Sequence, residues 1–129
     1  MKWGKEFSVG IQELDQQHSV LADCVTALEN AIGAKERWIS THSAIIRTAN
    51  YARFHFAVEE SLMRIHRYPL LETHIAEHQR FSNYQEELQT KSLTATMTQE
   101  AIAFIKGWLE QHVRAHDQPY AVHFRAHGG

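Results

Sequence analysis

The chain has 129 residues, 43% hydrophobic and 22% charged, and its net charge is −2, which is typical of one soluble domain. The 13 basic and 15 acidic residues leave no cationic excess with which to bind nucleic acid, and the longest apolar run, residues 101–105, is far shorter than the ~20 residues that span a bilayer. The single Cys24 excludes an internal disulfide, and the first residues contain no secretory signal, so a cytoplasmic protein without a membrane span is expected.

A short arm, residues 1–10, opens the chain and carries Trp3, Phe7 and Val9. Apolar positions then recur at steps of three and four, which predicts a first amphipathic helix over residues 11–32 that ends at Gly33. A second helix is predicted over residues 36–66. Its inward face is predicted to comprise Trp38, His42, Ile45, Ala49, Ala52, Phe56, Glu59, Leu62 and Met63.

A third helix is predicted to follow Pro69, and a polar connector to cover residues 90–97. The third helix shows an almost regular stripe of Leu71, His74, His78, Phe81, Gln85 and Leu88. Thr96 and Gln99 fit a capping box at the start of a fourth helix, whose inward face comprises Ile102, Ile105, Leu109, His112 and His116. Short connections favour antiparallel neighbours. We therefore predict an all-α fold, an up-down-up-down four-helix bundle with an N-terminal arm, as one domain over residues 1–129, with the bundle over 11–120 and a tail over 121–129.

Polar residues that can bind a metal interrupt all four apolar stripes. The interruptions are His18, His55 with Glu59, His74 with His78, and His112 with His116 and the adjacent Asp117. Residues four apart share a helix face, with Cβ atoms about 5–6 Å apart. Burying so many titratable groups is costly unless a cation compensates them together. Imidazole nitrogens and carboxylate oxygens suit iron, zinc, copper or manganese.

Each interruption also has an ordinary structural interpretation. A lone His18 is most often a hydrogen-bonded core histidine, and a single histidine–glutamate pair is usually a surface pair. Their concurrence on four consecutive stripes favours metal binding. Four further histidines have no comparable partner and are predicted to lie at the surface or to cap helices: His42, His66, His123 and His127.

The order and spacing of these residues resemble those of the hemerythrin family, and of its single-domain bacteriohemerythrins in particular. The resemblance extends from residue 3 to residue 120. The motifs that carry it are Trp3, Gly10-Ile11, Asp15-Gln16-Gln17-His18, His55-Phe56-x-x-Glu59-Glu60-x-Leu62-Met63, Tyr68-Pro69 before His74 and His78, and Trp108-Leu109-x-x-His112 before Asp117 and Tyr120.

The resemblance implies a non-haem di-iron centre with seven protein ligands. It assigns His74, His78 and His112 to one iron and His18 and His55 to the other. Glu59 and Asp117 would bridge the two irons together with a solvent-derived oxygen. The iron with two histidines would keep an open position for dioxygen, and Phe56 and Leu109 match positions near that open site.

Helix geometry and the resemblance disagree about the fourth helix. Five residues turn a regular α-helix by about 500°, which points Asp117 about 140° away from His112. Spacing alone therefore favours His116, whereas the resemblance and the need for anionic partners favour Asp117. Asp117 can reach the site if the helix is locally distorted or if the metals lie between the two directions. We assign Asp117, and leave His116 next to the ligands or exposed.

The first functional hypothesis is reversible dioxygen binding by a carrier, a store or a local supplier, in a monomeric protein that is not an enzyme. The alternatives are a sensor of oxygen, redox state or nitric oxide, and a di-iron enzyme such as a peroxidase. A sensor usually needs an output domain, and no further acid–base group is securely placed in the pocket by the sequence. Iron storage is a fourth hypothesis, but the sequence shows no carboxylate-lined route to the site.

Overall fold

The computed structural model describes residues 4–31, 37–90 and 95–127. Trp3 of the arm and Gly33, the predicted end of the first helix, lie outside these residues. The elements in chain order are the 3-10 turn η1 Lys5–Phe7, α1 Gln12–Ala31, α2 Arg37–Ile65, α3 Leu71–Gln89, α4 Ala95–His112, the π-helical turn η2 Val113–Asp117 and α5 Gln118–Ala126.

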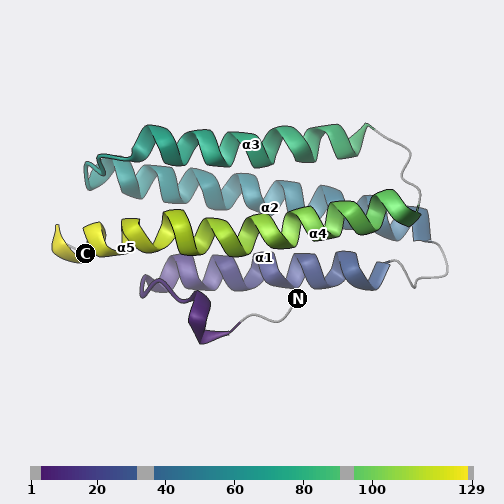
Figure 1. Cartoon of the computed structure of the whole chain (residues 1–129), viewed down its shortest axis with the longest axis horizontal. Coiled ribbons are helices and arrows are strands. Elements are labelled where there is room, and N and C mark those ends of the chain that lie inside the picture. The colour runs from purple at the N-terminus through teal and green to yellow at the C-terminus, as the bar shows by residue number, and fades with distance from the viewer. Residues whose placement is uncertain (1–3, 32–36, 91–94, 128–129) are drawn as a thin grey trace.

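The four long helices run side by side along the long axis of the molecule, and α5 continues the line of α4 (Figure 1). α1 packs against α2, α2 against α3, α3 against α4, and α4 against α1, so the helices close a four-membered ring. The predicted all-α four-helix bundle is thereby confirmed. Within the described residues, no helix is long and apolar enough to cross a membrane.

The arm is fixed to the bundle through Asp15 in the first turn of α1. One carboxylate oxygen of Asp15 accepts the backbone N–H of Val9 (2.7 Å), and the other accepts the hydroxyl of Ser8 (2.6 Å). Gln118 and Arg125 hold the arm from its other side by donating to the carbonyl oxygens of Ser8 (2.7 Å) and Val9 (3.0 Å). The arm therefore joins the start of α1 to α5.

Residues 121–126 differ from the predicted tail over 121–129, because α5 runs to Ala126; residues 128 and 129 lie outside the described residues. Besides the contact of Arg125 with the arm, His123 Nε2–H donates to the carbonyl oxygen of His66 (2.8 Å), and Phe124 packs against the core. The described part of α4 begins at Ala95, inside the predicted connector over residues 90–97. The predicted capping box depends on the Thr96 side chain, which lies outside what the structure describes, so it stays a prediction.

The turn between α2 and α3 fixes the register of the two helices. Arg67 adopts a positive φ of 52°, and the N–H of Tyr68 donates to the carbonyl of Met63 (2.9 Å), five residues back. This is a Schellman-type ending in which a non-glycine residue occupies the left-handed position. The tight reversal brings the last turns of α2 opposite the first turns of α3.

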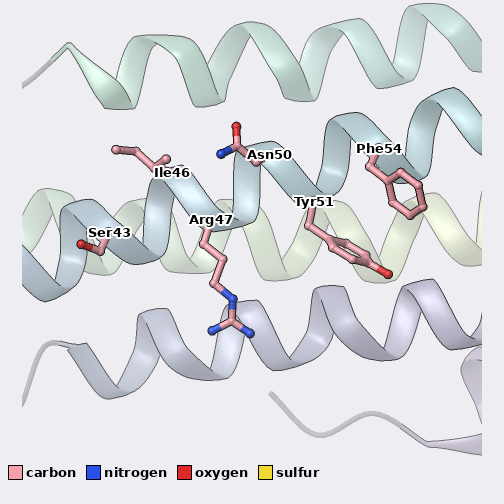
Figure 2. A pocket seen from close by; sticks show the side chains of 6 residues that line it. All are labelled: Ser43, Ile46, Arg47, Asn50, Tyr51 and Phe54. Carbon is pink, nitrogen blue, oxygen red and sulfur yellow. The ribbon is translucent and has the colours of Figure 1, made fainter.

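The inward face of α2 differs from the prediction at its N-terminal end. Trp38 is 76% exposed and His42 is also exposed, whereas Thr41 and Ile45 are buried. Further along, the outward face of α2 forms a shallow groove; its residues Ser43, Ile46, Arg47, Asn50, Tyr51 and Phe54 are shown in Figure 2. In this view Arg47 reaches toward α1 and Phe54 stays on the outer surface.

The expected monomeric state of the protein stays a prediction.

Candidate metal centre

Seven buried side chains converge between the helices, each at most 2% exposed. They are His18 of α1, His55 and Glu59 of α2, His74 and His78 of α3, His112 at the end of α4, and Asp117 at the end of η2. These are the seven residues that the resemblance assigns to the metal. They form two four-membered groups of closely spaced donor atoms that share Glu59: Glu59, His74, His78 and His112 in one group, and His18, His55, Glu59 and Asp117 in the other.

Glu59 lies between the two groups and faces each with a different oxygen. Its Oε1 contacts His74 Nε2, lies 3.1 Å from His78 Nε2 and lies 3.6 Å from His112 Nε2. Its Oε2 lies 3.4 Å from His55 Nε2 and 3.9 Å from His18 Nε2. A carboxylate with this orientation can bridge two cations.

Asp117 divides its oxygens in the same way. Its Oδ1 lies 2.9 Å from His74 Nε2 and 3.1 Å from His112 Nε2, and its Oδ2 lies 3.0 Å from His18 Nε2. The π-helical turn explains how Asp117 reaches the site. The N–H of Gln118 donates to the carbonyl of Val113, five residues back, so the wider turn rotates Asp117 toward the interior. The sequence analysis offered two explanations for how Asp117 could reach the site, and this π-turn is the first of them, a local distortion of the helix.

Two of the five clustered histidines have their outer ring nitrogens held by neighbouring side chains. His78 Nδ1–H donates to Glu60 Oε2 (2.8 Å), and His55 Nδ1–H donates to Gln17 Oε1 (2.7 Å). Both acceptors require a proton on Nδ1, so in the neutral ring Nε2 carries a lone pair and faces inward. The sequence placed Glu60 beside a ligand position but gave Gln17 no separate role. The only sequence feature that could have indicated a role for Gln17 is its position directly before His18.

The nitrogen spacing and the unpaired carboxylate oxygens fit bound cations. His78 Nε2 and His112 Nε2 lie 3.1 Å apart, as do His18 Nε2 and His55 Nε2. Two nitrogens at right angles around one metal, each about 2.1 Å away, lie about 3.0 Å apart. Within the described residues, Glu59 Oε2 and both oxygens of Asp117 are buried and accept no hydrogen bond of normal geometry, although histidine nitrogens lie close to them. A cation in each group would satisfy both the lone pairs and these oxygens.

The two carboxylates stay ionised although they are buried. Burial alone would raise the pKa of Glu59, but hydrogen bonds from the surrounding histidines hold it well below its usual value. At Asp117, burial and the negative charge of Glu59 would raise the pKa, but the positive charge of His112 outweighs them and lowers it. Burial opposes protonation of His112, yet Asp117 and Glu59 raise its pKa to about 10. For His55 burial prevails and lowers the pKa. A metal that binds His112 must therefore displace a proton.

Aromatic and aliphatic side chains cover the centre on one side. The ring of Phe56 stacks on His78 with centroids 3.9 Å apart, and Trp108 stacks on His112 at 4.5 Å. Phe56, Trp108 and Leu109 also line an enclosed pocket of only about 10 Å³. Its one hydroxyl, from Thr48, already donates to the carbonyl of Ala44 (2.7 Å). A pocket so small and apolar excludes water.

His116 lies outside the group of seven. Its Nε2 is 3.8 Å from Glu77 Oε1, and its side chain is 25% exposed. Its ring lies beside the rings of His112 and His74, with centroids 5.4 and 5.9 Å away. Of the other histidines, His66 is half-buried and donates from Nδ1 to the carbonyl of Leu62 (2.8 Å).

Comparison with known proteins agrees with this arrangement. A family model described as the hemerythrin HHE cation binding domain matches residues 9–121. The chain belongs to the hemerythrin family. This confirms the resemblance seen in the sequence motifs, and it explains why two carboxylates and five histidines meet inside a four-helix bundle, because this family binds non-haem iron.

Individual relatives match over nearly the whole chain. A bacteriohemerythrin of Stenotrophomonas maltophilia is 29% identical over 126 residues, which cover 97% of this chain and 82% of that protein. A hemerythrin-like protein of Naegleria gruberi is 32% identical over 118 residues, which cover 92% of this chain and 88% of that protein. A crystal structure of wild-type hemerythrin superimposes with a TM-score of 0.83, covering 95% of each chain at 24% identity. That structural likeness concerns the fold alone.

Proposed function

We propose that this protein binds dioxygen reversibly at a pair of iron ions, as an oxygen carrier, store or local supplier. In this proposal His74, His78 and His112 would hold one iron, His18 and His55 would hold the other, and Glu59 and Asp117 would be shared by both. The iron pair, when bound, supplies two electrons and an open coordination position for dioxygen.

The observation that carries the proposal is the unequal number of donors on the two sides. Both carboxylates divide their oxygens between the groups, but three histidines face one group and two face the other. With Glu59 and Asp117 counted on both sides, the side of His18 and His55 has four protein donors and the other side has five, which leaves room for a small exogenous ligand. Nitric oxide is a further small ligand that such an open ferrous position would accept.

The surrounding residues support binding rather than turnover. Phe56, Trp108 and Leu109 exclude water from the pocket beside the centre, which slows loss of the bound ligand to solvent. The hemerythrin family consists in general of non-enzymatic oxygen binders. Five histidines against two carboxylates also supply little negative charge to stabilise highly oxidised iron. We place Leu109 and Phe56 at the boundary between this dry pocket and the open position.

An optical spectrum of the reduced, iron-loaded protein tests the proposal before and after exposure to air. Reversible appearance of an oxygen-dependent charge-transfer band, which is lost again under vacuum, is the expected result. Irreversible conversion to an oxidised form would instead favour a sensor or an enzyme. Elemental analysis provides the second measurement, with about two irons per chain expected. One zinc per chain without iron would contradict the di-iron assignment.

A further inference from the structure

A second cavity, about 150 Å³ in volume, lies between α2 and α3 and is separate from the metal centre. On α3 the cavity lies beside Gln85, which is two helical turns after His78. Polar side chains line it, among them Ser82, Gln85 and Glu86 of α3 and Arg53 of α2. None of these residues belongs to the two groups of metal donors.

Gln85 is the unusual member of this lining. Its side chain is only 2% exposed, and its Oε1 and Nε2 are both buried without a hydrogen-bond partner among the described residues. A buried carboxamide with neither donor nor acceptor satisfied is rare in a native interior. Gln85 borders a cavity, and a rotation of its covered carboxamide toward that cavity lets a bound molecule supply the partner it lacks.

We propose that this cavity is a binding site for a small neutral molecule with an amide or urea edge. The carboxamide of Gln85 presents a donor and an acceptor side by side, and its complement presents an acceptor and a donor side by side. An amide or a urea meets this requirement. A carboxylate has no donor, and an ammonium or guanidinium group has no acceptor, so neither pairs with both atoms of Gln85.

The charge and the size of the cavity agree with such a ligand. Its lining contains one cation, Arg53, and one anion, Glu86, so the two formal charges cancel. Arg53 is already partly engaged, since its Nη2 donates to Asn50 Oδ1 (2.8 Å). A cavity of about 150 Å³ holds a molecule the size of benzene, which limits the ligand to roughly six non-hydrogen atoms.

Phe81 separates this cavity from the metal centre. It lines the Gln85 cavity on one side and the small dry pocket on the other. Its ring packs against Trp108 (4.4 Å between centroids) and against Phe56 (5.8 Å), which in turn stack on ligand histidines. Binding beside Gln85 therefore needs no contact with the metal, and the proposal stands independently of dioxygen binding.

Saturation-transfer NMR on the iron-loaded protein, with acetamide and urea as probes, tests this site. Saturable binding of acetamide with a millimolar dissociation constant is expected, because a four-atom ligand makes few contacts. Acetate and methylammonium, which are similar in size but charged, should bind at least 10-fold more weakly. Absence of saturable acetamide binding would show that the cavity holds only water and would overturn the proposal.

Two substitutions on α3 provide the matched pair. Gln85→Met keeps the side-chain length but removes both polar atoms, so acetamide binding should weaken at least 10-fold while the melting temperature stays the same or rises. Gln79→Met changes an exposed glutamine outside the cavity and should leave binding unchanged. If Gln85→Met does not fold, Gln85→Glu serves instead, because it removes the donor of the pair. Undiminished acetamide binding in the variant examined would overturn the proposal.

Discussion

The two halves of the metal centre are built differently. In the half formed by α3 and α4, three histidines face Glu59 Oε1, and two of their rings are covered by Phe56 and Trp108. In the half formed by α1 and α2, two histidines face Glu59 Oε2, and their rings meet edge to face at 4.7 Å. The first half is more crowded, whereas the second has fewer donors.

The outer partners of the histidines repeat this difference. His78 in the crowded half donates to a carboxylate, Glu60, while His55 in the other half donates to a neutral amide, Gln17. A charged acceptor makes the imidazole a stronger electron donor than a neutral one does. In the proposed di-iron centre, this difference would let one half retain its metal firmly and the other exchange an external ligand.

Removing a histidine from the crowded half should have the largest effect. His74 contacts both carboxylates, so His74→Ala should abolish stable iron binding and with it the stabilisation that iron gives to the fold. Iron per chain and the melting temperatures of iron-loaded and iron-stripped protein measure this. His42→Ala, at an exposed position of α2, is the control and should change neither. Equal melting of loaded and stripped wild-type protein would contradict the structural role of the metal.

The next prediction concerns which residue of the fourth helix bridges the halves. Asp117→Ala should lose most of its iron, because Asp117 faces both groups, whereas His116→Ala should retain about two irons per chain. Iron analysis and the oxygenated spectrum of the two variants decide the matter. Normal loading of the Asp117 variant together with iron loss in the His116 variant would show that His116 is the ligand.

This choice also shows how far the sequence could predict the site. The four helices and six of the seven donors follow from spacing, because His55, Glu59, His74 and His78 recur at helical steps on buried stripes and His18 and His112 occupy such stripes as well. Asp117 does not follow from spacing, because a regular helix points it away from His112. The resemblance supplied Asp117, and the π-turn of Val113–Asp117 gives the physical reason.

Other features could not be predicted because their signals are weak or depend on distant contacts. Gln17 resembles an ordinary polar residue of α1 until α2 brings His55 beside it. Residues 121–129 were predicted to be a tail, but Arg125 and His123 find carbonyl partners in the arm and in the α2–α3 turn. The exposure of Trp38 shows that a helical stripe alone does not determine burial near a helix end.

Enlarging the small dry pocket that Leu109 lines should distinguish a packing role from a role in excluding water. Leu109→Ala should lower the free energy of unfolding by about 2–5 kcal/mol. It should also enlarge the dry pocket and admit water, which speeds loss of the oxygenated form. Leu28→Ala, a fully buried leucine elsewhere in the core, is the control and should lose similar stability without faster decay. Equal decay rates of the oxygenated band in both variants would leave Leu109 with a packing role only.

Acidity should act in opposite directions on the iron-free fold and on iron binding. The pKa of His112 is raised to about 10, so its protonation stabilises the iron-free fold fully below about pH 6.5, and this stabilisation is lost as the pH rises toward 10. Asp117 and Glu59, with lowered pKa values, contribute stability that is lost in acid. Iron must displace the proton of His112, so its affinity should rise with pH. Melting of stripped protein and chelator competition at about pH 6 and pH 8.5 measure both trends. A stripped protein that melts higher at the alkaline pH would contradict this assignment.

The smallest effect is expected from a substitution that gives both halves a neutral acceptor for the outer histidine nitrogen and leaves all seven proposed metal ligands in place. Glu60→Gln gives His78 a neutral acceptor like that of His55, so the oxidised irons lose a nearby negative charge. The midpoint potential should rise, and iron affinity should fall about 10-fold. Spectroelectrochemical titration and chelator competition measure the two quantities. Gln17→Glu makes the reciprocal change and should lower the potential.

Glu77→Gln is the control for this prediction. It removes the same charge from an acid that lies near His116 and contacts none of the seven donors. An equal shift in the Glu77 and Glu60 variants would mean that overall charge, and not the hydrogen bond to His78, sets the potential.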